Sequence, residues 1–313
     1  MSKPRVYIDG QEGTTGLQIY ERLGDRDDIE LLRIDEDRRK DTAERRKFLN
    51  GADLVFLCLP DDAAREAVSL VTNERTRIID CSTAHRTAAG WVYGFPELTG
   101  QRERIRTARR VANPGCYATG FLSLVRPLVE QGVLPADARL TCHAVSGYTG
   151  GGKKAISQYG GPDREMELDS PRHYAVSLSH KHLPEMAKLA GLERGPLFMP
   201  MICDFPQGMV VTVPLWLEEL NGAQSIESLR VLYAGYYQGS AVVELRPADA
   251  PSCGFIGSNN LAGKDTLQIF VNGNGEQVML SARLDNLGKG ASGAAVQNMN
   301  LMLGFEETTG LAL

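Results

Sequence analysis

Close to its start the chain reads Arg5-Val6-Tyr7-Ile8-Asp9-Gly10-Gln11-Glu12-Gly13-Thr14-Thr15-Gly16. An apolar strand over Arg5–Asp9 runs into three glycines spaced G-x-x-G-x-x-G, and a helical pattern over Thr14–Leu23 follows. This is the context of a dinucleotide-binding loop, although that fingerprint is usually G-x-G-x-x-G. Amides at the start of the helix would hold a pyrophosphate there. A tight turn without a ligand is the alternative, and the position at the head of the chain favours the dinucleotide.

The chain continues to alternate strands and helices. The strands that we expect have continuous apolar runs, which is typical of a parallel sheet covered on both faces. The sequence therefore predicts an α/β fold with a Rossmann-type, doubly wound parallel sheet. Its expected strands are Ile29–Ile34, Leu54–Leu59 and Arg77–Cys81, its next helix is Asp61–Val71, and the charged segment Asp35–Lys47 is expected to be a solvated loop and helix.

After about residue 116 the pattern changes. A helix behind Cys116 ends near Gly132, and period-two stretches then indicate a second α+β domain with a largely antiparallel sheet. We predict a dinucleotide-binding domain over residues 1–115 and 290–313 and a second domain over 116–289. The patterns behind this are strands at Arg139–Val145, Met209–Leu217, Leu267–Val271 and Gln277–Arg283, a helix at Ser225–Gln238, and a closing helix at Ala291–Leu303 suited to packing on the first domain.

Composition and charge exclude several functional classes. The chain has 313 residues, 42% of them hydrophobic, and a net charge of −5, which argues against a general nucleic-acid binder. No apolar run approaches the length that spans a bilayer, and a strand begins almost directly after Met1, so we expect neither a membrane segment nor a signal peptide. These observations favour a soluble, cytoplasmic protein.

The cysteines are scattered and form no C-x-x-C pair. This predicts reduced thiols in a cytosolic protein, and neither a disulfide framework nor a metal ribbon. Most of them, such as Cys58 in an apolar run, are expected to be structural. The six positions are 58, 81, 116, 142, 203 and 253.

Cys116 differs from the other cysteines. It follows the turn Asn113-Pro114-Gly115, and apolar residues then recur at helical spacing. The thiol is therefore expected at a helix N-terminus, where unpaired N–H groups and the helix dipole favour the reactive thiolate. The main-chain amide of Cys116 is also our candidate donor to an oxyanion. A small buried core residue is the alternative.

Two histidines supply a candidate acid–base group. They lie in Ser179-His180-Lys181-His182-Leu183-Pro184-Glu185, just before an expected helix. An imidazole exchanges protons near neutral pH, as a thiol nucleophile requires of its partner. A metal site that adds His173 is disfavoured, because no matching carboxylate or cysteine spacing surrounds the pair. Hydrogen-bonded structural histidines are the other alternative.

Two further stretches have charges or donors suited to an anion. Arg33, Arg38 or Arg39, beyond the second strand, are placed to bind the 2′-phosphate of NADP, whereas Asp35 is placed to bind the 2′-hydroxyl of NAD. The sequence leaves this choice open. The stretch from Ser146 to Lys154 offers amides, hydroxyls and lysines to an oxyanion or phosphate, and a flexible glycine loop is the alternative.

Together these motifs resemble the short form of the N-acetyl-γ-glutamyl-phosphate reductases, in the aspartate-semialdehyde dehydrogenase superfamily. The resemblance covers essentially the whole chain. The motif around Cys116 and the His-x-His-x-Pro-Glu motif are specific, whereas many dehydrogenases share the glycine loop. The stretches that carry it are Gly10–Gly16, Ala112–Thr119, Ser146-Gly147, His180–Glu185 and Asn286–Asn298.

The resemblance implies NADP(H) as cofactor and a reversible reductive dephosphorylation of an acyl phosphate through a Cys116 thioester, with release of phosphate. It implies His180 as the acid–base residue, with His182 as the fallback. It also implies a homodimer or homotetramer formed through the second domain. The implied substrate or oxyanion residues are Asn113, Ser146, Gly147 and Tyr174, and the implied cofactor-binding residues are Gly10, Gly13, Thr14, Thr15, Gly16, Arg33, Arg38, Pro60, Ser82 and Asn286.

Other functions remain compatible with the sequence. Aspartate-semialdehyde dehydrogenase, with which the family belongs, is a near alternative, and the relative acting on an aminoadipyl phosphate is closer still. No residue by itself fixes the acyl chain. A dinucleotide-binding regulator without catalysis is a further alternative. Such a regulator would not need both a cysteine presented by a turn and a His-x-His segment.

Overall fold

The computed structural model describes residues 2–162, 164–247 and 254–313. The chain forms two compact units, one of residues 1–114 with 291–311 and the other of residues 115–290 with the last two residues. Ala312 and Leu313 belong to the second unit because they are bonded there: the Ala312 N–H donates to Asp265 Oδ2 at 2.8 Å, and Lys264 Nζ donates to the Leu313 carbonyl at 2.6 Å. Cys253 lies outside the described residues.

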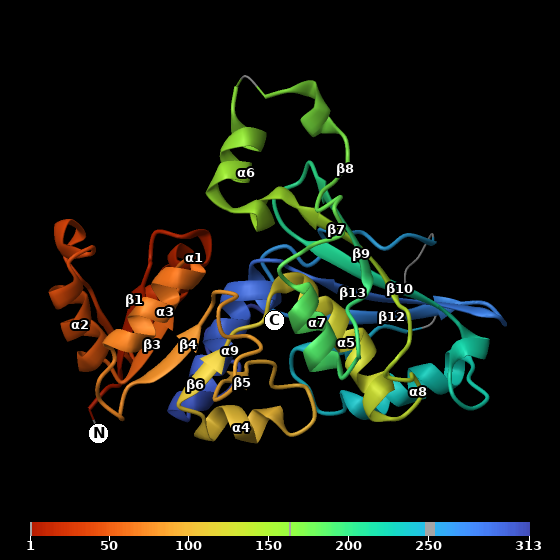
Figure 1. Ribbon diagram of the computed structural model, residues 1–313, viewed down its shortest axis with the longest axis horizontal. Helices are drawn as coiled ribbons and strands as arrows, with labels where there is room; N and C mark the ends of the chain where they lie inside the picture. Colours follow the sequence, from red (N-terminus) through yellow and green to blue (C-terminus); the bar gives the residue numbers. More distant parts are fainter. Residues whose placement is uncertain (1, 163, 248–253) are drawn as a thin grey trace. The chain divides into compact units, whose positions relative to one another are not determined.

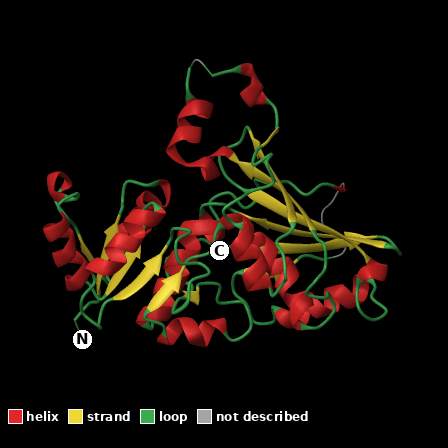
Figure 2. Cartoon of the chain, in the orientation of Figure 1, coloured by secondary structure: helices red, strands yellow, loops and turns green. Residues whose placement is uncertain are grey.

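The first unit is built on a parallel sheet, which confirms the predicted doubly wound fold (Figures 1 and 2). Every strand pair that the structure describes in this sheet is parallel. β5 and β6 were not predicted, because strands of two or three residues leave too short a pattern. The order is β2 (Glu30–Leu32), β1 (Arg5–Asp9), β3 (Leu54–Leu57), β4 (Arg77–Asp80), β6 (Arg110–Ala112), β5 (Val92–Tyr93).

Alternate residues of these strands feed two separate cores. In β1, Val6 and Ile8 join one core while Tyr7 joins the other, as the period of two in a strand requires. Each core is closed by helices, so both faces of the sheet are dry and the strands read as continuous apolar runs. One core contains residues of α1 (Thr14–Gly24), α4 (Gln101–Thr107) and α9 (Gly293–Leu303), and the other contains residues of α2 (Thr42–Gly51) and α3 (Asp61–Leu70).

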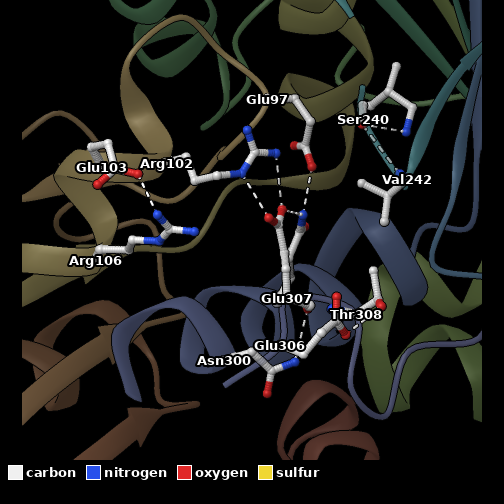
Figure 3. A network of polar contacts seen from close by, with 12 residues as sticks. Glu97, Arg102, Glu103, Arg106, Ser240, Val242, Asn300, Glu306, Glu307 and Thr308 are labelled. Atoms are coloured by element: carbon white, nitrogen blue, oxygen red, sulfur yellow. Dashed lines mark hydrogen bonds and ion pairs between the residues drawn. The ribbon is translucent and has the colours of Figure 1, made fainter. Parts of the chain in front are cut away.

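Polar side chains hold the end of the chain against α9 and α4 (Figure 3). Arg102 forms an ion pair with Glu307, Nε to Oε2 at 2.7 Å. Gln297 Nε2 donates to Glu97 at 2.6 Å and to Glu307 at 2.8 Å. Asn300 Nδ2 donates to the carbonyl oxygens of Glu307 and Thr309. These bonds fix the segment after α9 within the first unit.

The second unit contains a seven-stranded mixed sheet (Figure 2). In the described residues four neighbouring pairs are antiparallel, and β7–β9 and β11–β12 are parallel. The expected sheet is thus largely antiparallel, and the parallel strand β9 is the main element that the sequence missed. The order is β11 (Val243–Leu245), β12 (Leu267–Gly273), β13 (Gln277–Leu284), β10 (Met209–Trp216), β7 (Thr141–Gly147), β9 (Leu197–Cys203), β8 (Arg172–His173).

Helix α5 (Cys116–Glu130) packs against this sheet, and α7 (Leu183–Ala190) and α8 (Ile226–Tyr236) pack against α5. The contact with β10 is close: a Cβ at Gly120 would lie 2.5 Å from the Val211 side chain. The Tyr237 hydroxyl on the turn after α8 donates to the Ser123 carbonyl at 2.8 Å. No helix within the described ranges has both the length and the apolar character required for a bilayer crossing.

The stretch after β7 is more ordered than a flexible glycine loop. Ser146 and Gly147 belong to the strand itself, and a short 3-10 turn over Tyr148–Gly151 leads into α6 (Gly152–Gly160). Lys153 and Lys154 therefore lie on a helix. The three adjacent glycines concealed its start, because glycine is a poor residue inside helices but is accepted at their ends.

Candidate functional site

The glycine loop turns tightly around the end of β1. Gly10 has a φ of +88°, and a Cβ there would lie 2.4 Å from the Cys58 carbonyl oxygen. A Cβ at Gly16 would lie 2.4 Å from the Gly10 carbonyl oxygen. Both positions therefore require glycine, Gly10 also for its backbone conformation. Gly13 is the N-cap of α1, and Thr14 and Thr15 begin its first turn, so the amides there face no side-chain cap.

A pocket of about 660 Å³ lies beside this loop within the first unit. The pocket lies at the carboxyl ends of β1 and β3, which are neighbours in the sheet. β2 lies on the far side of β1, and β4 lies on the far side of β3. Doubly wound sheets bind their ligands at such a switch point. Among the predicted cofactor residues, Gly10, Gly13 and Pro60 line the pocket. Cys58, which we interpreted as structural, lines it too.

Of the three arginines predicted as alternatives for the 2′-phosphate, Arg39 lines the pocket. Arg39 lines it and forms an ion pair with Glu12, and Lys40 lines it as well. The pocket lining contains neither Arg33, whose guanidinium lies 5.2 Å from the centroid of the Tyr20 ring, nor Arg38, which is paired with Glu44 at 2.8 Å. The structure therefore brings Arg39 to the pocket and leaves Arg33 and Arg38 outside its lining.

A buried ion pair lines the pocket beside the glycine loop. Arg45 Nη2 lies 2.8 Å from Asp9 Oδ2, and both residues line the pocket. Burial raises the pKa of Asp9, and the hydrogen bond and charge of Arg45 oppose that shift. Free amides at the start of α1, together with Arg39 and Lys40, fit the phosphates of a dinucleotide, and Gly10 leaves room for their close approach.

Ser82 is held by its own neighbours in the first unit. Its hydroxyl donates to Asp80 Oδ2 at 2.8 Å and its N–H to Asp80 Oδ1 at 2.9 Å. Asp80 Oδ2 also contacts His85 Nδ1 at 2.6 Å. Ser82 does not line the pocket. The carboxylate organises the turn after β4, and Ser82 is part of that turn.

The turn that presents Cys116 has the predicted form. Pro114 and Gly115 follow β6, and α5 begins at Cys116 with Gly115 as its N-cap. The Gly115 N–H donates to Glu185 Oε1 at 2.9 Å, and Glu185 is a buried residue of α7. Gly290 lies against the nucleophile candidate, since a Cβ there would be 2.8 Å from the Cys116 Cβ. The thiol is half-buried.

Asn113, which is predicted as a substrate or oxyanion residue, has its side chain bound to protein. Its Nδ2 donates to the Ala291 carbonyl at 2.9 Å, and its Oδ1 accepts from Asn298 Nδ2 at 3.1 Å. Only 1% of the residue is exposed. Both ends of this amide are therefore occupied within the first unit, and in this structure Asn113 shapes the turn.

His180 and His182 lie side by side just before α7. Their ring centroids are 4.7 Å apart and their planes are nearly perpendicular. The His182 N–H donates to His180 Nδ1 at 3.1 Å. Because an accepting Nδ1 carries no proton, the neutral His180 ring has its proton on Nε2. His180 is thus oriented to give or take a proton at Nε2, while His182 is buried as the N-cap residue of α7.

Two tyrosines link these histidines to Cys116. The Tyr117 ring lies 5.8 Å from that of His180 and 5.9 Å from that of His182, and the Tyr174 ring lies 5.9 Å from that of His180. Burial raises the pKa of both phenols well above the ordinary value, and the nearby charge of Cys116 raises it further. Both hydroxyls keep their protons at neutral pH and can donate hydrogen bonds beside the thiol.

Three other predicted residues tie loops of the second unit together. Ser146 is buried, and its hydroxyl donates to the Gly147 carbonyl at 3.1 Å. The Gly147 N–H donates to the Gly208 carbonyl at 2.9 Å. Asn286 Oδ1 accepts from the Gly208 N–H at 2.9 Å, and its Nδ2 donates to Thr149 Oγ1 at 3.0 Å. The Asn286 amide, predicted to bind the cofactor, is thus bonded at both ends within this unit.

Two family models match the chain. The NAD-binding domain of semialdehyde dehydrogenases matches residues 32–108, and the dimerisation domain of the same enzymes matches residues 116–286. N-acetyl-gamma-glutamyl-phosphate reductase 2 of Nostoc sp. (strain PCC 7120) is 51% identical over 322 residues, which cover 99% of this chain and 100% of that protein. The reductase of Sinorhizobium fredii is 51% identical over 306 residues, 96% and 99% of the two chains.

The chain belongs to the N-acetyl-gamma-glutamyl-phosphate reductase family. Among solved structures it is similar to aspartate semialdehyde dehydrogenase II of Vibrio cholerae, with a TM-score of 0.71 and 16% identity over 97% of this chain and 99% of that one. The aspartate semialdehyde dehydrogenase of Francisella tularensis gives a TM-score of 0.70 at 13% identity, over 95% and 99% of the two chains. These two likenesses show the shared fold.

Sequence reasoning gave no individual role to three residues that contact Cys116 or the turn before it in this family member. Glu185 was quoted within a motif but given no role, although an acidic residue in an apolar helical turn is a signal for a buried, bonded carboxylate. Gly290 and Asn298 lie far along the chain from Cys116, and no local pattern connects them with the turn. Among the described residues, no three His, Cys, Asp or Glu side chains are grouped to hold a metal ion.

Proposed function

We propose that the protein catalyses the NADPH-dependent reductive dephosphorylation of N-acetyl-γ-glutamyl phosphate to N-acetylglutamate 5-semialdehyde, a step of arginine biosynthesis. The observation that carries the proposal is Cys116 at the first position of α5, with two protonated tyrosines near its thiol, Tyr117 and Tyr174, whose rings lie 5.8 and 5.9 Å from that of His180. Full-length identity of 51% to reductases named for this substrate supports it.

In the first step the Cys116 thiolate attacks the acyl carbon. The S–C bond forms, the bond from that carbon to the phosphate oxygen breaks, and phosphate leaves with the electron pair. An acyl phosphate is already activated, so no strong base is needed. The developing oxyanion needs a donor, and a well-placed donor is typically worth about 3–4 kcal/mol. We assign that role to the Cys116 amide at the start of α5, with the Tyr117 and Tyr174 hydroxyls close to the thiol.

In the second step the Cys116 thioester is reduced. NADPH, when bound, supplies the hydride to the thioester carbonyl. His180 protonates the resulting alkoxide from Nε2 when its ring is in the imidazolium form, and the ring becomes neutral. His180 takes that proton back at Nε2 as the C–S bond breaks, so that the aldehyde leaves and the thiolate of Cys116 is restored.

The residues of the first unit would hold the cofactor. The α1 amides and Gly10 suit its pyrophosphate, and Arg39 and Lys40 suit the 2′-phosphate of NADP. Asp35, the residue placed for a ribose hydroxyl of NAD, is exposed and begins a short 3-10 turn over Glu36–Arg38. We therefore expect a preference for NADPH over NADH.

A substrate panel tests the activity. N-acetylglutamate semialdehyde, aspartate semialdehyde and an aminoadipate semialdehyde are compared by kcat/KM in the oxidative direction, with phosphate and NADP⁺. We expect the first to be preferred. Preference for either of the others would assign the protein to a different acyl phosphate, and no turnover with any of them, while dinucleotide still binds, would favour a regulator.

Replacing Arg39 tests the cofactor. Arg39→Ala should raise KM for NADPH about tenfold, because a charge-assisted bond to phosphate is lost, and should leave KM for NADH nearly unchanged. Arg38→Ala is the matched control, since Arg38 is paired with Glu44 outside the pocket lining. An equal change with both cofactors, or a wild-type preference for NADH, would contradict the assignment.

The open face of the second sheet is proposed to form a homodimer. Helices α5 and α8 pack on one face, and exposed apolar residues lie on the other. Pro214 and Met279 are paired across β10 and β13, Trp216 is two residues beyond Pro214 on the same face, and Trp216 and Met279 are 46% and 40% exposed. Apolar surface of this kind marks an interface.

The mass of the protein in solution tests this face. Trp216→Lys should shift the species measured by light scattering toward the monomer. Val231→Lys is the control, because Val231 is also apolar and exposed (65%) but lies on α8. A monomeric wild type, or a Trp216 variant that stays oligomeric, would contradict the proposed interface.

We place the protein in the cytoplasm, where the free thiols found at the described cysteines persist.

A further inference from the structure

Asn298, on α9, is fully buried in the first unit and its amide is bound next to the turn that precedes Cys116. Its Nδ2 donates to the Gly94 carbonyl at 2.9 Å and to Asn113 Oδ1 at 3.1 Å. Position 94 is shaped for it, since a Cβ there would lie 2.4 Å from Asn298 Nδ2.

The direction of this amide pair is fixed at both ends by carbonyl groups, which can only accept. The Ala291 carbonyl accepts from Asn113 Nδ2, so the Asn113 oxygen faces Asn298. The Gly94 carbonyl accepts from Asn298 Nδ2, so the Asn298 nitrogen faces Asn113. Each amide can therefore be placed in only one orientation, and the pair forms a directed ladder from α9 to the turn.

The main chain of Asn113 is held as firmly as its side chain. Its N–H donates to the Asp80 carbonyl at 2.8 Å, and its carbonyl accepts from Arg86 Nε at 3.0 Å. Asn113 is three residues before Cys116, and only Pro114 and Gly115 lie between them. A displacement of Asn113 is therefore passed directly to the start of α5.

We propose that Asn298 is a positioning residue, which fixes through Asn113 the turn that presents Cys116. The inference rests on the proposed function, in which Cys116 is the nucleophile. Asn298 is not among the residues that line the glycine-loop pocket. A misplacement of about 1 Å in a reacting group can cost on the order of 100-fold in rate, so loss of the ladder acts on the chemical step.

The test is Asn298→Ala, assayed with N-acetylglutamate semialdehyde, phosphate and NADP⁺. We expect kcat to fall by about 10- to 100-fold while KM for NADP⁺ changes less than about twofold, because the glycine-loop pocket is untouched. The rate of Cys116 alkylation by iodoacetamide is measured against pH in the same variant. Its midpoint is expected to move to higher pH as the thiol loses its fixed position at the helix start.

Asn300→Ala is the matched control on the same helix. Its Nδ2 also donates to two carbonyl groups, those of Glu307 and Thr309, but it holds the end of the chain (Figure 3). We expect Asn300→Ala to lower Tm comparably, while kcat and the alkylation profile stay close to wild type. Equal kcat losses and equal profiles in the two variants would overturn the proposal and leave Asn298 a structural residue.

A double-mutant cycle tests the path through Asn113. Asn113→Ala and the double variant are compared with Asn298→Ala, and we expect the double variant to lose no more than about twofold beyond either single variant. Additive losses would overturn the path. If Asn298→Ala does not fold, Asn113→Ala opens the same ladder from the other side. The alkylation profile needs no turnover, so it separates a failure of this inference from a failure of the proposed function, which Cys116→Ser tests.

Discussion

Helices α1 and α5 each follow a parallel strand and each begin after a glycine N-cap, Gly13 and Gly115, that has no side-chain cap. The loop before α1 is held by its own backbone: the Gly13 N–H donates to the Gly10 carbonyl at 3.1 Å. The turn before α5 is held by side chains from elsewhere in the chain. Glu185 binds the Gly115 N–H, and Asn298 binds Asn113.

The difference fits the two roles proposed for these helix starts, anion binding for α1 and a nucleophile for α5. An anion-binding loop needs unoccupied amides and space, which glycine supplies locally. A nucleophile has to be held in one position, and a turn of Asn, Pro and Gly cannot do this alone. Distant side chains therefore hold the turn before Cys116, whereas the loop before α1 is complete within seven residues.

Cys116→Ser is the severest test of the nucleophile turn. We expect kcat to fall by roughly 10⁴-fold or more, because no other group can form the thioester. The measurement is semialdehyde oxidation with phosphate and NADP⁺. Cofactor affinity, followed by fluorescence, is the control and should stay at the wild-type value. Turnover close to wild type would exclude the thioester mechanism.

His180→Asn should have the next largest effect. Loss of a positioned acid–base group typically costs about 10²–10⁴-fold, and the pH profile of kcat should flatten. His182→Asn is the paired variant, because His182 is the buried N-cap of α7 and its N–H orients His180. If His182→Asn flattens the profile and His180→Asn does not, the roles of the two histidines are reversed.

Gly10→Ala tests the loop before α1. The positive φ and the 2.4 Å approach to the Cys58 carbonyl predict a loss of roughly 1–3 kcal/mol in unfolding free energy and weaker cofactor binding. Gly24→Ala is the control, since α1 ends there and a Cβ meets no atom within 4 Å. Its effect should stay below about 1 kcal/mol. Equal effects would mean that the loop is not constrained as described.

The smallest expected effect lies away from both helix starts, at His143 on β7. Burial and the nearby charge of His173 lower the pKa of His143 from its ordinary 6.5. As pH falls through 6.5 the unfolded chain binds the proton first, so this group destabilises the fold in acid. His143→Gln should therefore make the fall in Tm between neutral pH and pH 5.5 shallower. An unchanged slope would contradict the shift.

Much of the first unit could be predicted because its signals are local. Continuous apolar runs predict the strands β1, β3 and β4, since alternate residues feed two closed cores. The helix start at Cys116 follows from its own turn. Strands β5 and β6 were missed because they are too short, and β9 because Pro200 stands in the middle of its apolar run, where proline argues against a strand.

The candidate site was predicted only in part. Residue type and turn context indicate Cys116 and the pair of His180 and His182 as candidate site residues. The sequence could not show which arginine lines the pocket, because a charged segment gives no sign of which side chain faces inward. In the structure Arg39 lines it. The side-chain amides of Asn113 and Asn286 could bind either a ligand or a polar group of the protein. Only their neighbours in space, Asn298 and Thr149 among them, decide between the two.

By itself the sequence determined the strand–glycine–helix start, the position of Cys116 at the head of a helix, and the two histidines before another. Each of these depends on backbone preferences within about ten residues. The tertiary structure alone decided which groups contact the turn and the residue behind it: Glu185, Gly290 and Asn298 lie 69 to 182 residues further along the chain than Cys116. The residues of a turn set the direction of the chain, but the rigidity of the turn depends on packing and hydrogen bonds that form only when the chain folds.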